Sequence, residues 1–218
     1  MAGLKILVIG GGKVSEHLFK IFRVQDEADE VIVVDRERER RQVFENLGDV
    51  LFLEGDATDI KLYDEVNMRE VTAVLALTNS DETNLLVLAI AKTFNVPIRI
   101  GRFTEPEIAE LVVKLGLGIP VVQPVVIANV IAQMLTSITN GRELGSVNDE
   151  KIIMVTISES DPVVENRIEE INLGDEGRII LLFDGMKFKI PEPGDIVKPG
   201  NLLIIAARNS DVVRRIKG

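Results

Sequence analysis

Short runs of β-branched and other apolar residues alternate with segments of helical period through the first half of the chain. Strands covered on both faces read as nearly continuous apolar runs, whereas helices repeat their apolar positions every three to four residues. Strand and helix in alternation predict an α/β fold with a doubly wound parallel sheet and right-handed crossovers. The predicted strands span residues 4–10, 31–35, 50–56, 72–78, 98–103 and 119–123.

The segments between the strands carry helix signals. Helical spacing puts Val14, Leu18 and Ile21 on one face of the helix after the first strand, so we expect that face to be buried. The charge run "DRERERRQ" (35–42) is interpreted as the first turn of a solvated helix. Two pairs have the spacing of a capping box, Asn79 with Glu82 and Thr104 with Glu107.

Residues 124–141 form a long apolar stripe at helical spacing after the sixth predicted strand. The stripe is broader than one edge strand requires. Two interpretations remain open: the helix covers the sheet edge, or it also makes a subunit contact.

The chain is expected to hold two domains. Residues 1–140 form the α/β domain, and residues 141–150 are polar, contain glycine and lack periodicity, so they are interpreted as a linker. Residues 151–218 are expected to form a small α+β domain, in which strands are separated by turns rich in proline and glycine. A short helix is expected over residues 163–173, and another at the C-terminus.

The glycines of "IGGGKVS" (9–15) lie where the first predicted strand ends and a helix begins. Gly10 permits a tight turn, and Gly12 lets a diphosphate approach the N–H groups at the positive end of the helix. The third position of the usual pattern is Ser15, which is small enough for close helix and strand packing. This succession of strand, glycine turn and helix predicts a Rossmann-like dinucleotide site. The alternative is a tight turn that binds no ligand.

Asp35 is the last residue of the second predicted strand, at the place where an acid can accept hydrogen bonds from a ribose diol. Arg36 follows it and leaves the cofactor type open. The arginine could attract a 2′-phosphate or stack on adenine, whereas Asp35 would repel a 2′-phosphate.

Several stretches in chain order resemble the regulator of potassium conductance (RCK/KTN) family, the cytoplasmic Trk/Ktr-type, TrkA-like subunits of potassium transporters and channels. The likeness covers nearly the whole chain. It implies an N-terminal nucleotide-binding domain and a small C-terminal regulatory domain. The stretches are "GGGKVS", "VIVVD", "GDATD" (55–59), "ALTNSDETNL" (76–85), "GRF" (101–103) and "PEPGDIVKPGNLLII" (191–205).

The resemblance also implies roles for individual residues. Lys13 stands where the family usually carries an arginine that meets phosphate, and Arg102 matches a residue facing the phosphates. Asp56 and Ala57 match positions beside the adenine, while Thr78 and Asn79 belong to the loop that closes over the ligand. The expected cofactor-binding set is Gly10, Gly12, Lys13, Asp35, Arg36, Asp56, Ala57, Thr78, Asn79 and Arg102.

Three of these residues also have a structural explanation. Asp56 could cap the next helix, Asn79 could cap its own helix, and Arg102 could pair with a surface acid. All three nevertheless lie at the carboxyl ends of predicted parallel strands, and ligands of such sheets bind in the crevice there.

An NAD(P)-dependent oxidoreductase is the alternative function. Such an enzyme needs an acid or base near the nicotinamide, often His, Lys or Tyr. The chain has one histidine, His17, expected at the boundary of the first helix, and one tyrosine, Tyr63, without an obvious partner. We therefore expect a binding protein rather than an enzyme, and no metal site, since "QDEADE" (25–30) is interpreted as a solvated acidic turn.

Composition excludes several classes of function. The absence of cysteine excludes disulfide scaffolds, thiol catalysis and cysteine metal sites. A net charge of −10, most of it in residues 1–150, argues against general nucleic-acid binding. The longest apolar runs are about eight residues, too short for a membrane span, so any transporter partner must be another polypeptide.

The resemblance therefore implies a cytoplasmic regulatory subunit, held at the inner face of the membrane by a potassium transporter or channel. It would gate that partner in response to NAD(H) or an adenine nucleotide such as ATP, ADP or AMP. A homodimer or a larger ring is expected. The residues alone leave the choice of nucleotide, the ligand of the C-terminal domain and the number of subunits open.

Overall fold

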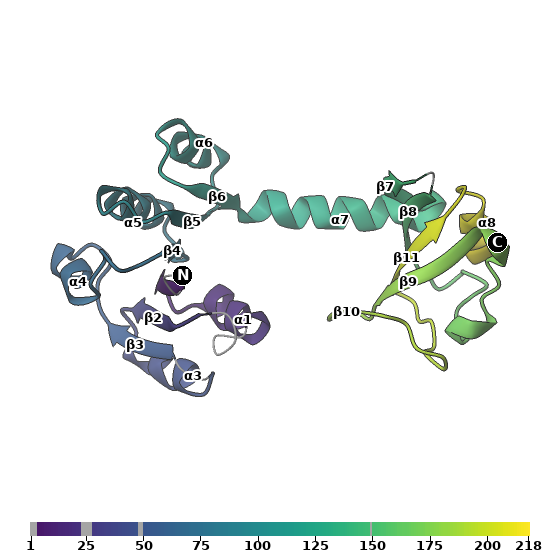
Figure 1. Cartoon of the computed structure of the whole chain (residues 1–218), viewed down its shortest axis with the longest axis horizontal. Coiled ribbons are helices and arrows are strands. Elements are labelled where there is room, and N and C mark those ends of the chain that lie inside the picture. The colour runs from purple at the N-terminus through teal and green to yellow at the C-terminus, as the bar shows by residue number, and fades with distance from the viewer. Residues whose placement is uncertain (1–3, 23–27, 48–49, 149) are drawn as a thin grey trace. The chain divides into compact units, whose positions relative to one another are not determined.

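The computed structural model describes residues 4–22, 28–47, 50–148 and 150–218. The chain divides into two compact units, Met1–Val126 and Ile127–Gly218, and each is built on its own sheet (Figure 1). Among the described residues, no helix has the length and apolar character to cross a membrane. Residues 25–27 of the acidic segment 25–30 lie outside the described residues.

The first unit contains a six-stranded parallel sheet with the strand order β3-β2-β1-β4-β5-β6. Chain order reverses between β1 and β4, which is where an open α/β sheet forms its ligand crevice. The expectation of a Rossmann-like doubly wound sheet is confirmed. The strands are β1 (Lys5–Ile9), β2 (Glu30–Asp35), β3 (Val50–Glu54), β4 (Ala73–Ala76), β5 (Ile98–Phe103) and β6 (Ile119–Val122).

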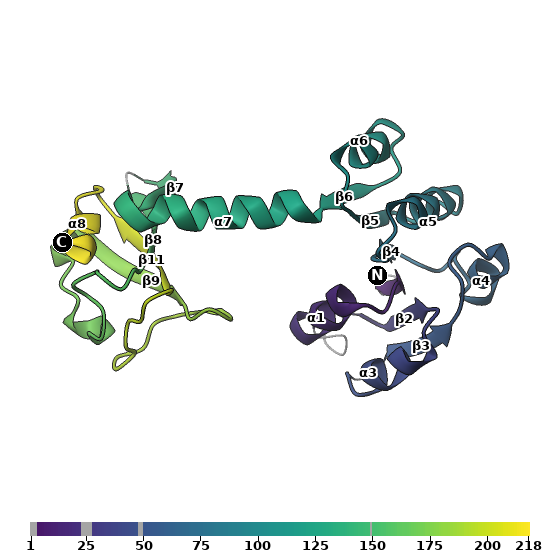
Figure 2. The ribbon, with the colours of Figure 1, turned by 180° about the vertical axis from the view of Figure 1, so that it is seen from behind.

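Helices cover both faces of this sheet, because successive strand residues point to opposite faces. Leu7 and Ile9 of β1 belong to the apolar cluster under α4, α5 and α6, whereas Ile6 and Val8 belong to the cluster under α1 and α3. Figure 2 shows α1 and α3 on one side and α4 and α5 on the other. The helices are α1 (Lys13–Ile21), the 3-10 turn η1 (Arg38–Arg40), α3 (Arg41–Glu45), α4 (Ile60–Glu65), α5 (Asp81–Thr93) and α6 (Pro106–Lys114).

The buried face of α1 differs from the predicted one. Val14 is 40% exposed and Ile21 is 83% exposed, whereas Ser15 and Phe19 are buried. Phe19 packs edge-on against Phe44 of α3, with ring centroids 6.2 Å apart. The helix is rotated because Ser15, the small residue of the glycine turn, must face the strand, and this need overrides the apolar stripe.

The predicted capping boxes were also wrong. The N-cap of α5 is Ser80, whose Oγ accepts a hydrogen bond from Thr83 N at 3.1 Å, so Asn79 lies one residue outside the helix. The N-cap of α6 is Glu105, and its side chain makes no capping bond. The backbone N–H groups of Thr104 and Glu105 instead donate to the carboxylate of Asp81, which replaces the local cap.

The second unit holds an antiparallel sheet with the strand order β10-β9-β11-β8-β7. It confirms the expected small α+β domain, but residues 142–147 are a strand of this sheet, so the predicted linker over 141–150 was wrong. The elements are α7 (Gln123–Asn140), β7 (Arg142–Val147), β8 (Glu150–Thr156), η2 (Ile168–Glu170), η3 (Gly174–Glu176), β9 (Gly177–Phe183), β10 (Phe188–Lys189), β11 (Leu202–Ala207) and α8 (Val212–Lys217).

The helix predicted over residues 163–173 is absent; the segment contains turns and the short 3-10 helix η2. Glu165 adopts a φ of +65°, which breaks a helix, and its N–H donates to Val197 O at 2.9 Å. Ile168 N likewise donates to Asp195 O at 2.8 Å. Backbone donors that a helix would use internally are therefore bound to a neighbouring loop.

Candidate functional site

The turn between β1 and α1 requires glycine at position 10. Gly10 has a φ of +102°, and a Cβ placed there would lie 2.8 Å from the backbone nitrogen of Thr78. The hydroxyl of Ser15 donates to the carbonyl oxygen of Gly10, and Gly10 N donates to Val34 O at 2.8 Å. Close packing of three backbone segments thus fixes the shape of the turn.

Gly12 differs from Gly10 because the space beside it is open. It is the N-cap residue of α1, no side chain caps the helix, and a Cβ at Gly12 would meet no atom within 4 Å. The first N–H groups of a helix have no partner inside it, and the helix dipole is positive at this end. The open side of Gly12 is therefore suited to an anionic group of a ligand.

Asp35 is held in place by two backbone donors. Gly11 N donates to its Oδ2 at 2.6 Å, and Glu37 N donates to its Oδ1 at 2.8 Å. A carboxylate oxygen accepts about two hydrogen bonds, so each oxygen retains one acceptor position. Asp35 therefore keeps acceptor positions that a ligand hydroxyl could use, and it connects the glycine turn to the end of β2.

Arg36 and Asp56 form an ion pair beside the site. Arg36 Nη2 lies 2.8 Å from Asp56 Oδ1, and the backbone N–H and the hydroxyl of Thr58 donate to the same oxygen. The Thr58 N–H and, after it, the Arg36 guanidinium lower the pKa of Asp56 to about 2. Asp56 does not cap α4, since Asp59 accepts the hydrogen bond from Lys61 N.

The loops after β4 and β5 are joined by the fully buried side chain of Asn84. Its Oδ1 accepts hydrogen bonds from Thr78 N at 3.0 Å and from the Thr78 hydroxyl at 2.7 Å. Its Nδ2 donates to Thr78 O at 3.0 Å and to Arg102 O at 2.7 Å. All four hydrogen-bonding positions of the amide are used, so Thr78 and Arg102 are fixed relative to each other.

These segments enclose one cavity of about 480 Å³ at the carboxyl ends of the strands, within the usual range for ligand pockets. Nine of the ten residues expected from the sequence line it, all except Asp56, which lies behind Arg36. Eight lining residues were missed: the polar residues and glycine Glu37, Arg40, Gly55, Ser80 and Thr83, and the apolar residues Ile9, Val34 and Leu77.

Arg40 had a sequence signal that was interpreted otherwise. It belongs to the charge run 35–42, which was assigned to a solvated helix. The 3-10 turn η1 brings Arg40 back to the glycine turn, where its Nε donates to Gly11 O at 2.7 Å. The sequence does not distinguish an arginine of a solvated helix from an arginine that lines a cavity, so the role of Arg40 was missed.

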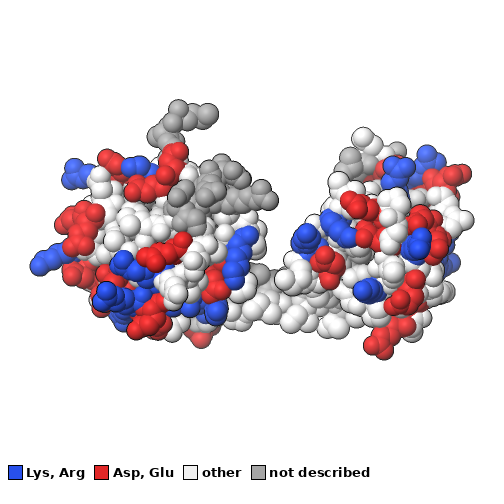
Figure 3. Space-filling model, turned by 90° about the horizontal axis from the view of Figure 1, so that it is seen from below, with Lys and Arg blue, Asp and Glu red and all other residues white. Residues whose placement is uncertain are grey.

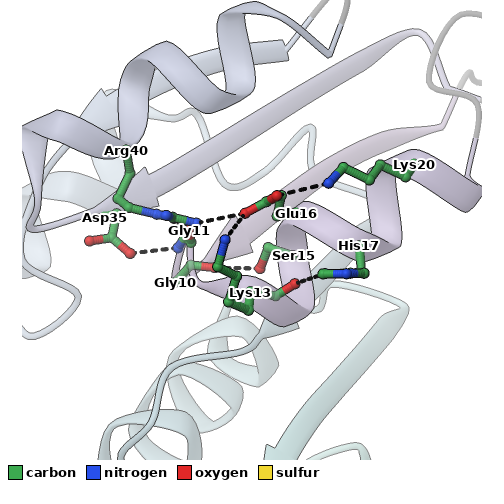
Figure 4. A network of polar contacts seen from close by, with 9 residues as sticks. All are labelled: Gly10, Gly11, Lys13, Ser15, Glu16, His17, Lys20, Asp35 and Arg40. Carbon is green, nitrogen blue, oxygen red and sulfur yellow. Dashed lines mark hydrogen bonds and ion pairs between the residues drawn. The ribbon is translucent and has the colours of Figure 1, made fainter.

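Glu16, in the first turn of α1, gathers three cations (Figure 4). Lys13 Nζ lies 2.9 Å from Glu16 Oε2, Lys20 Nζ lies 2.8 Å from Oε1, and Arg40 Nη2 lies 3.4 Å from Oε2. Hydrogen bonds from Lys20 and, after it, Lys13 lower the pKa of Glu16 to about 2. The Glu16 side chain is only 12% exposed, so its charge acts in a poorly solvated place.

The candidate proton carriers of an enzyme have other partners. The Tyr63 side chain is fully buried, its hydroxyl donates to Ala57 O at 2.6 Å, and burial raises its pKa to about 12. His17 is exposed, with Nδ1 2.9 Å from Lys13 O. Neither residue lines the cavity.

Two other depressions fit a ligand less well. One of about 340 Å³ contains Lys5, whose ammonium is paired with Glu70 at 2.6 Å and Glu30 at 3.4 Å. One in the second unit, of about 400 Å³, is mainly apolar. On the face that Figure 3 shows, acidic and basic side chains are interspersed, without the single basic patch typical of nucleic-acid binding.

Comparison with known proteins gives concordant matches. The sequence profile of the TrkA-N domain matches residues 6–124. The Trk system potassium uptake protein TrkA homolog of Pyrococcus abyssi (strain GE5 / Orsay) is 30% identical over 214 residues, covering 94% of this chain and 92% of the relative. The protein of the same name from Methanothermobacter thermautotrophicus (strain ATCC 29096 / DSM 1053 / JCM 10044 / NBRC 100330 / Delta H) is 24% identical over 218 residues, covering 98% and 99%.

Solved structures share the fold. The crystal structure of the GsuK RCK domain matches with a TM-score of 0.70 and 16% identity, covering 99% of this chain and 48% of that chain. The GsuK channel bound to NAD matches with a TM-score of 0.68 and 16% identity, covering 99% and 39%. At this identity the two structures show the likeness of the fold alone.

Proposed function

The chain belongs to the TrkA-N domain family, and on this premise we propose that it is a regulatory subunit of a potassium-transport system that binds NAD(H) or an adenine nucleotide. The bound ligand would gate a membrane-embedded potassium transporter or channel. The protein would act in the cytoplasm, at the inner face of the membrane, through that partner.

One observation carries the proposal of nucleotide binding. Residues from the ends of five strands line a single cavity: Gly10 after β1, Asp35 of β2, Ala57 after β3, Thr78 after β4 and Arg102 of β5. Ligands of doubly wound sheets bind at this edge. The open side of Gly12, the ribose acceptor Asp35 and the cations beside them suit a diphosphate joined to adenosine.

Regulation requires the ligand to distinguish two states of the assembly, because a ligand with equal affinity for both shifts nothing. We propose that the first unit binds the nucleotide, that the second unit is regulatory, and that α7, which joins them in sequence, takes part in the change. Large apolar side chains of α7 are exposed and support a contact with a second copy in a homodimer or ring, namely Val126, Ile127, Val130, Ile131 and Leu135.

An NAD(P)-dependent oxidoreductase is the second candidate, since the glycine turn would suit either function. The positions of Tyr63 and His17 favour the regulatory proposal, because general acid–base catalysis needs a group within hydrogen-bond reach of the substrate. Turnover of NADH or NADPH would distinguish the two functions.

The test is the melting temperature of the purified chain with NADH, NAD, NADPH, ATP, ADP and AMP. A ligand at about 100 times its Kd adds about 2.7 kcal/mol to the free energy of unfolding. The Gly12→Val variant should fold normally and lose the shift, because its side chain enters the cavity. The control is Glu105→Val, at the N-cap of α6, which no side chain caps. This variant should keep the ligand-induced shift in melting temperature.

If no ligand shifts the melting temperature, or if Gly12→Val keeps the full shift, the cavity is not a nucleotide site. Oxidation of NADH by the wild type, followed by absorbance, would favour the enzyme instead. Loss of potassium uptake in source cells that carry only the Gly12→Val chain would link the cavity to transport.

A further inference from the structure

The ion pairs of the first helix turn reduce the positive charge that the cavity offers to a ligand. Four basic residues line it: Lys13, Arg36, Arg40 and Arg102. Glu16 forms ion pairs with Lys13 and Arg40, and Asp56 forms an ion pair with Arg36. Among the ion pairs that the described residues form, Arg102 has none.

Glu16 is placed to act on the ligand through these cations. Glu16 does not line the cavity, and Figure 4 shows its carboxylate in contact with Lys13 and Arg40. Arg40 is further fixed by its bond to Gly11 O, so it cannot turn fully toward a ligand without losing two contacts. A ligand phosphate that approaches Lys13 or Arg40 therefore meets a cation that is already paired with Glu16.

We propose that Glu16 is a specificity-determining residue of this site and makes it prefer adenine ligands of low phosphate charge, NADH or AMP, over ADP and ATP. This inference rests on the proposed nucleotide-binding function and names the ligand class of that site. Near neutral pH, ATP carries about four negative charges, whereas AMP and NADH carry about two. Repulsion by a fixed carboxylate grows with the ligand charge, and it is screened little in a partly buried place.

A purely structural role is the alternative for Glu16. An acid in the first turn of a helix is stabilised by the helix dipole, and the pairs with Lys13 and Lys20 are at favourable helical spacings. Such a role would change the stability of α1 and would affect all ligands by the same factor. The dependence of the effect on ligand charge separates the two roles.

The test is the Kd of AMP, ADP, ATP and NADH, measured by titration calorimetry on the full chain and its Glu16→Gln variant. We expect Glu16→Gln to tighten ATP binding about tenfold, ADP less, and AMP and NADH no more than about threefold. The difference should shrink at high salt. The matched control Glu110→Gln removes a carboxylate from an exposed ion pair on α6 and should leave every Kd within about twofold.

A reciprocal variant covers the case in which Glu16→Gln is poorly folded. Lys20 pairs with Glu16 at 2.8 Å and does not line the cavity. Lys20→Gln leaves the Glu16 charge less compensated, so ATP binding should weaken about threefold relative to AMP. A structural role predicts no such dependence on ligand charge.

Equal changes for all four ligands in both variants, or no change in either, would overturn the role of Glu16 and leave nucleotide binding intact. Wild-type protein that binds none of the four ligands, and does not bind NAD either, would overturn the proposed function, and this inference with it.

Discussion

The two sides of the cavity are built in different ways. On the side of β4 and β5, the buried amide of Asn84 and the carboxylate of Asp81 hold the loops through hydrogen bonds to the backbone. On the side of α1, Lys13 and Arg40 form ion pairs with Glu16 that involve side chains alone. The first side is held by hydrogen bonds to the backbone, whereas two cations of the second side are paired with a carboxylate outside the cavity lining.

This difference predicts which substitutions should lower the stability of the fold and which should change only the preference for one ligand over another. Breaking a buried and fully satisfied network leaves polar groups without partners, at a cost of about 1–3 kcal/mol for each group. An ion pair with a largely solvated partner, such as Lys13 with its side chain 76% exposed, contributes about 0–1 kcal/mol. Stability should therefore respond to substitutions on the first side, and ligand preference to substitutions on the second.

The largest expected effect is on Asn84. Replacing it by leucine, Asn84→Leu, keeps the volume but removes four hydrogen bonds, so the free energy of unfolding should fall by about 3 kcal/mol. Urea unfolding followed by circular dichroism measures the loss. The exposed Asn46, which donates one bond to Gln42 O, is the control, and Asn46→Ala should cost less than about 0.5 kcal/mol. Similar losses in both variants would contradict a special role for the Asn84 amide.

The next largest effect is a difference in stability between substitutions of Gly10 and of Gly12. Gly10→Ala places a Cβ 2.8 Å from Thr78 N at a φ of +102°, so we expect a loss of about 2 kcal/mol. Gly12→Ala has open space and a φ of −74°, and its stability should stay within about 0.5 kcal/mol of the wild type. Denaturant midpoints of both variants check this, and equal losses would show that Gly12 is also needed for the turn.

A smaller effect on stability is expected for Tyr63, which does not line the cavity. Tyr63→Phe removes the hydrogen bond to Ala57 O and should lower the free energy of unfolding by about 1 kcal/mol. Nucleotide affinity, measured by calorimetry, should be unchanged because Tyr63 does not line the cavity. A loss of affinity without a loss of stability would mean that the Tyr63 hydroxyl acts on the ligand.

The smallest effect is on the pH dependence of stability. The pKa of Glu16 is lowered from 4.5 to about 2, so its contribution to stability is present above pH 4.5 and is lost as the pH falls toward 2. The urea midpoint of the wild type should therefore drop more between pH 5 and pH 2.5 than that of Glu16→Gln. Parallel curves for the two proteins would show that the Glu16 ion pairs add nothing to stability.

Much of the fold was predictable because its signals are local and repeated. The alternation of apolar runs and helical segments predicted the parallel sheet, and the glycines with Asp35 predicted the sheet edge at which the cavity lies. The signals failed where a tertiary contact overrides a local pattern. Ser15 rotates α1 away from its apolar stripe, Asp81 replaces the cap of α6, and neighbouring loops take the backbone donors of residues 163–173.

The parts of the site that sequence missed depend on distant segments. Arg40 is brought to the glycine turn by η1, and Asn84 acts on Arg102 O, 18 positions away in the chain. Nothing in the spacing of these residues marks such contacts. The predicted linker failed for a similar reason, since Arg142–Val147 becomes a strand only by pairing with β8.

The most direct test of the central claim is a ¹H–¹⁵N spectrum of the chain titrated with NADH. We predict saturable shifts of the amide signals of Gly12, Lys13 and Thr78, which lie around the cavity. In the same titration of Gly12→Val, the amide signals of Lys13 and Thr78 should not shift. Saturable shifts confined to other regions, or the same shifts in Gly12→Val, would contradict a nucleotide site at the glycine turn.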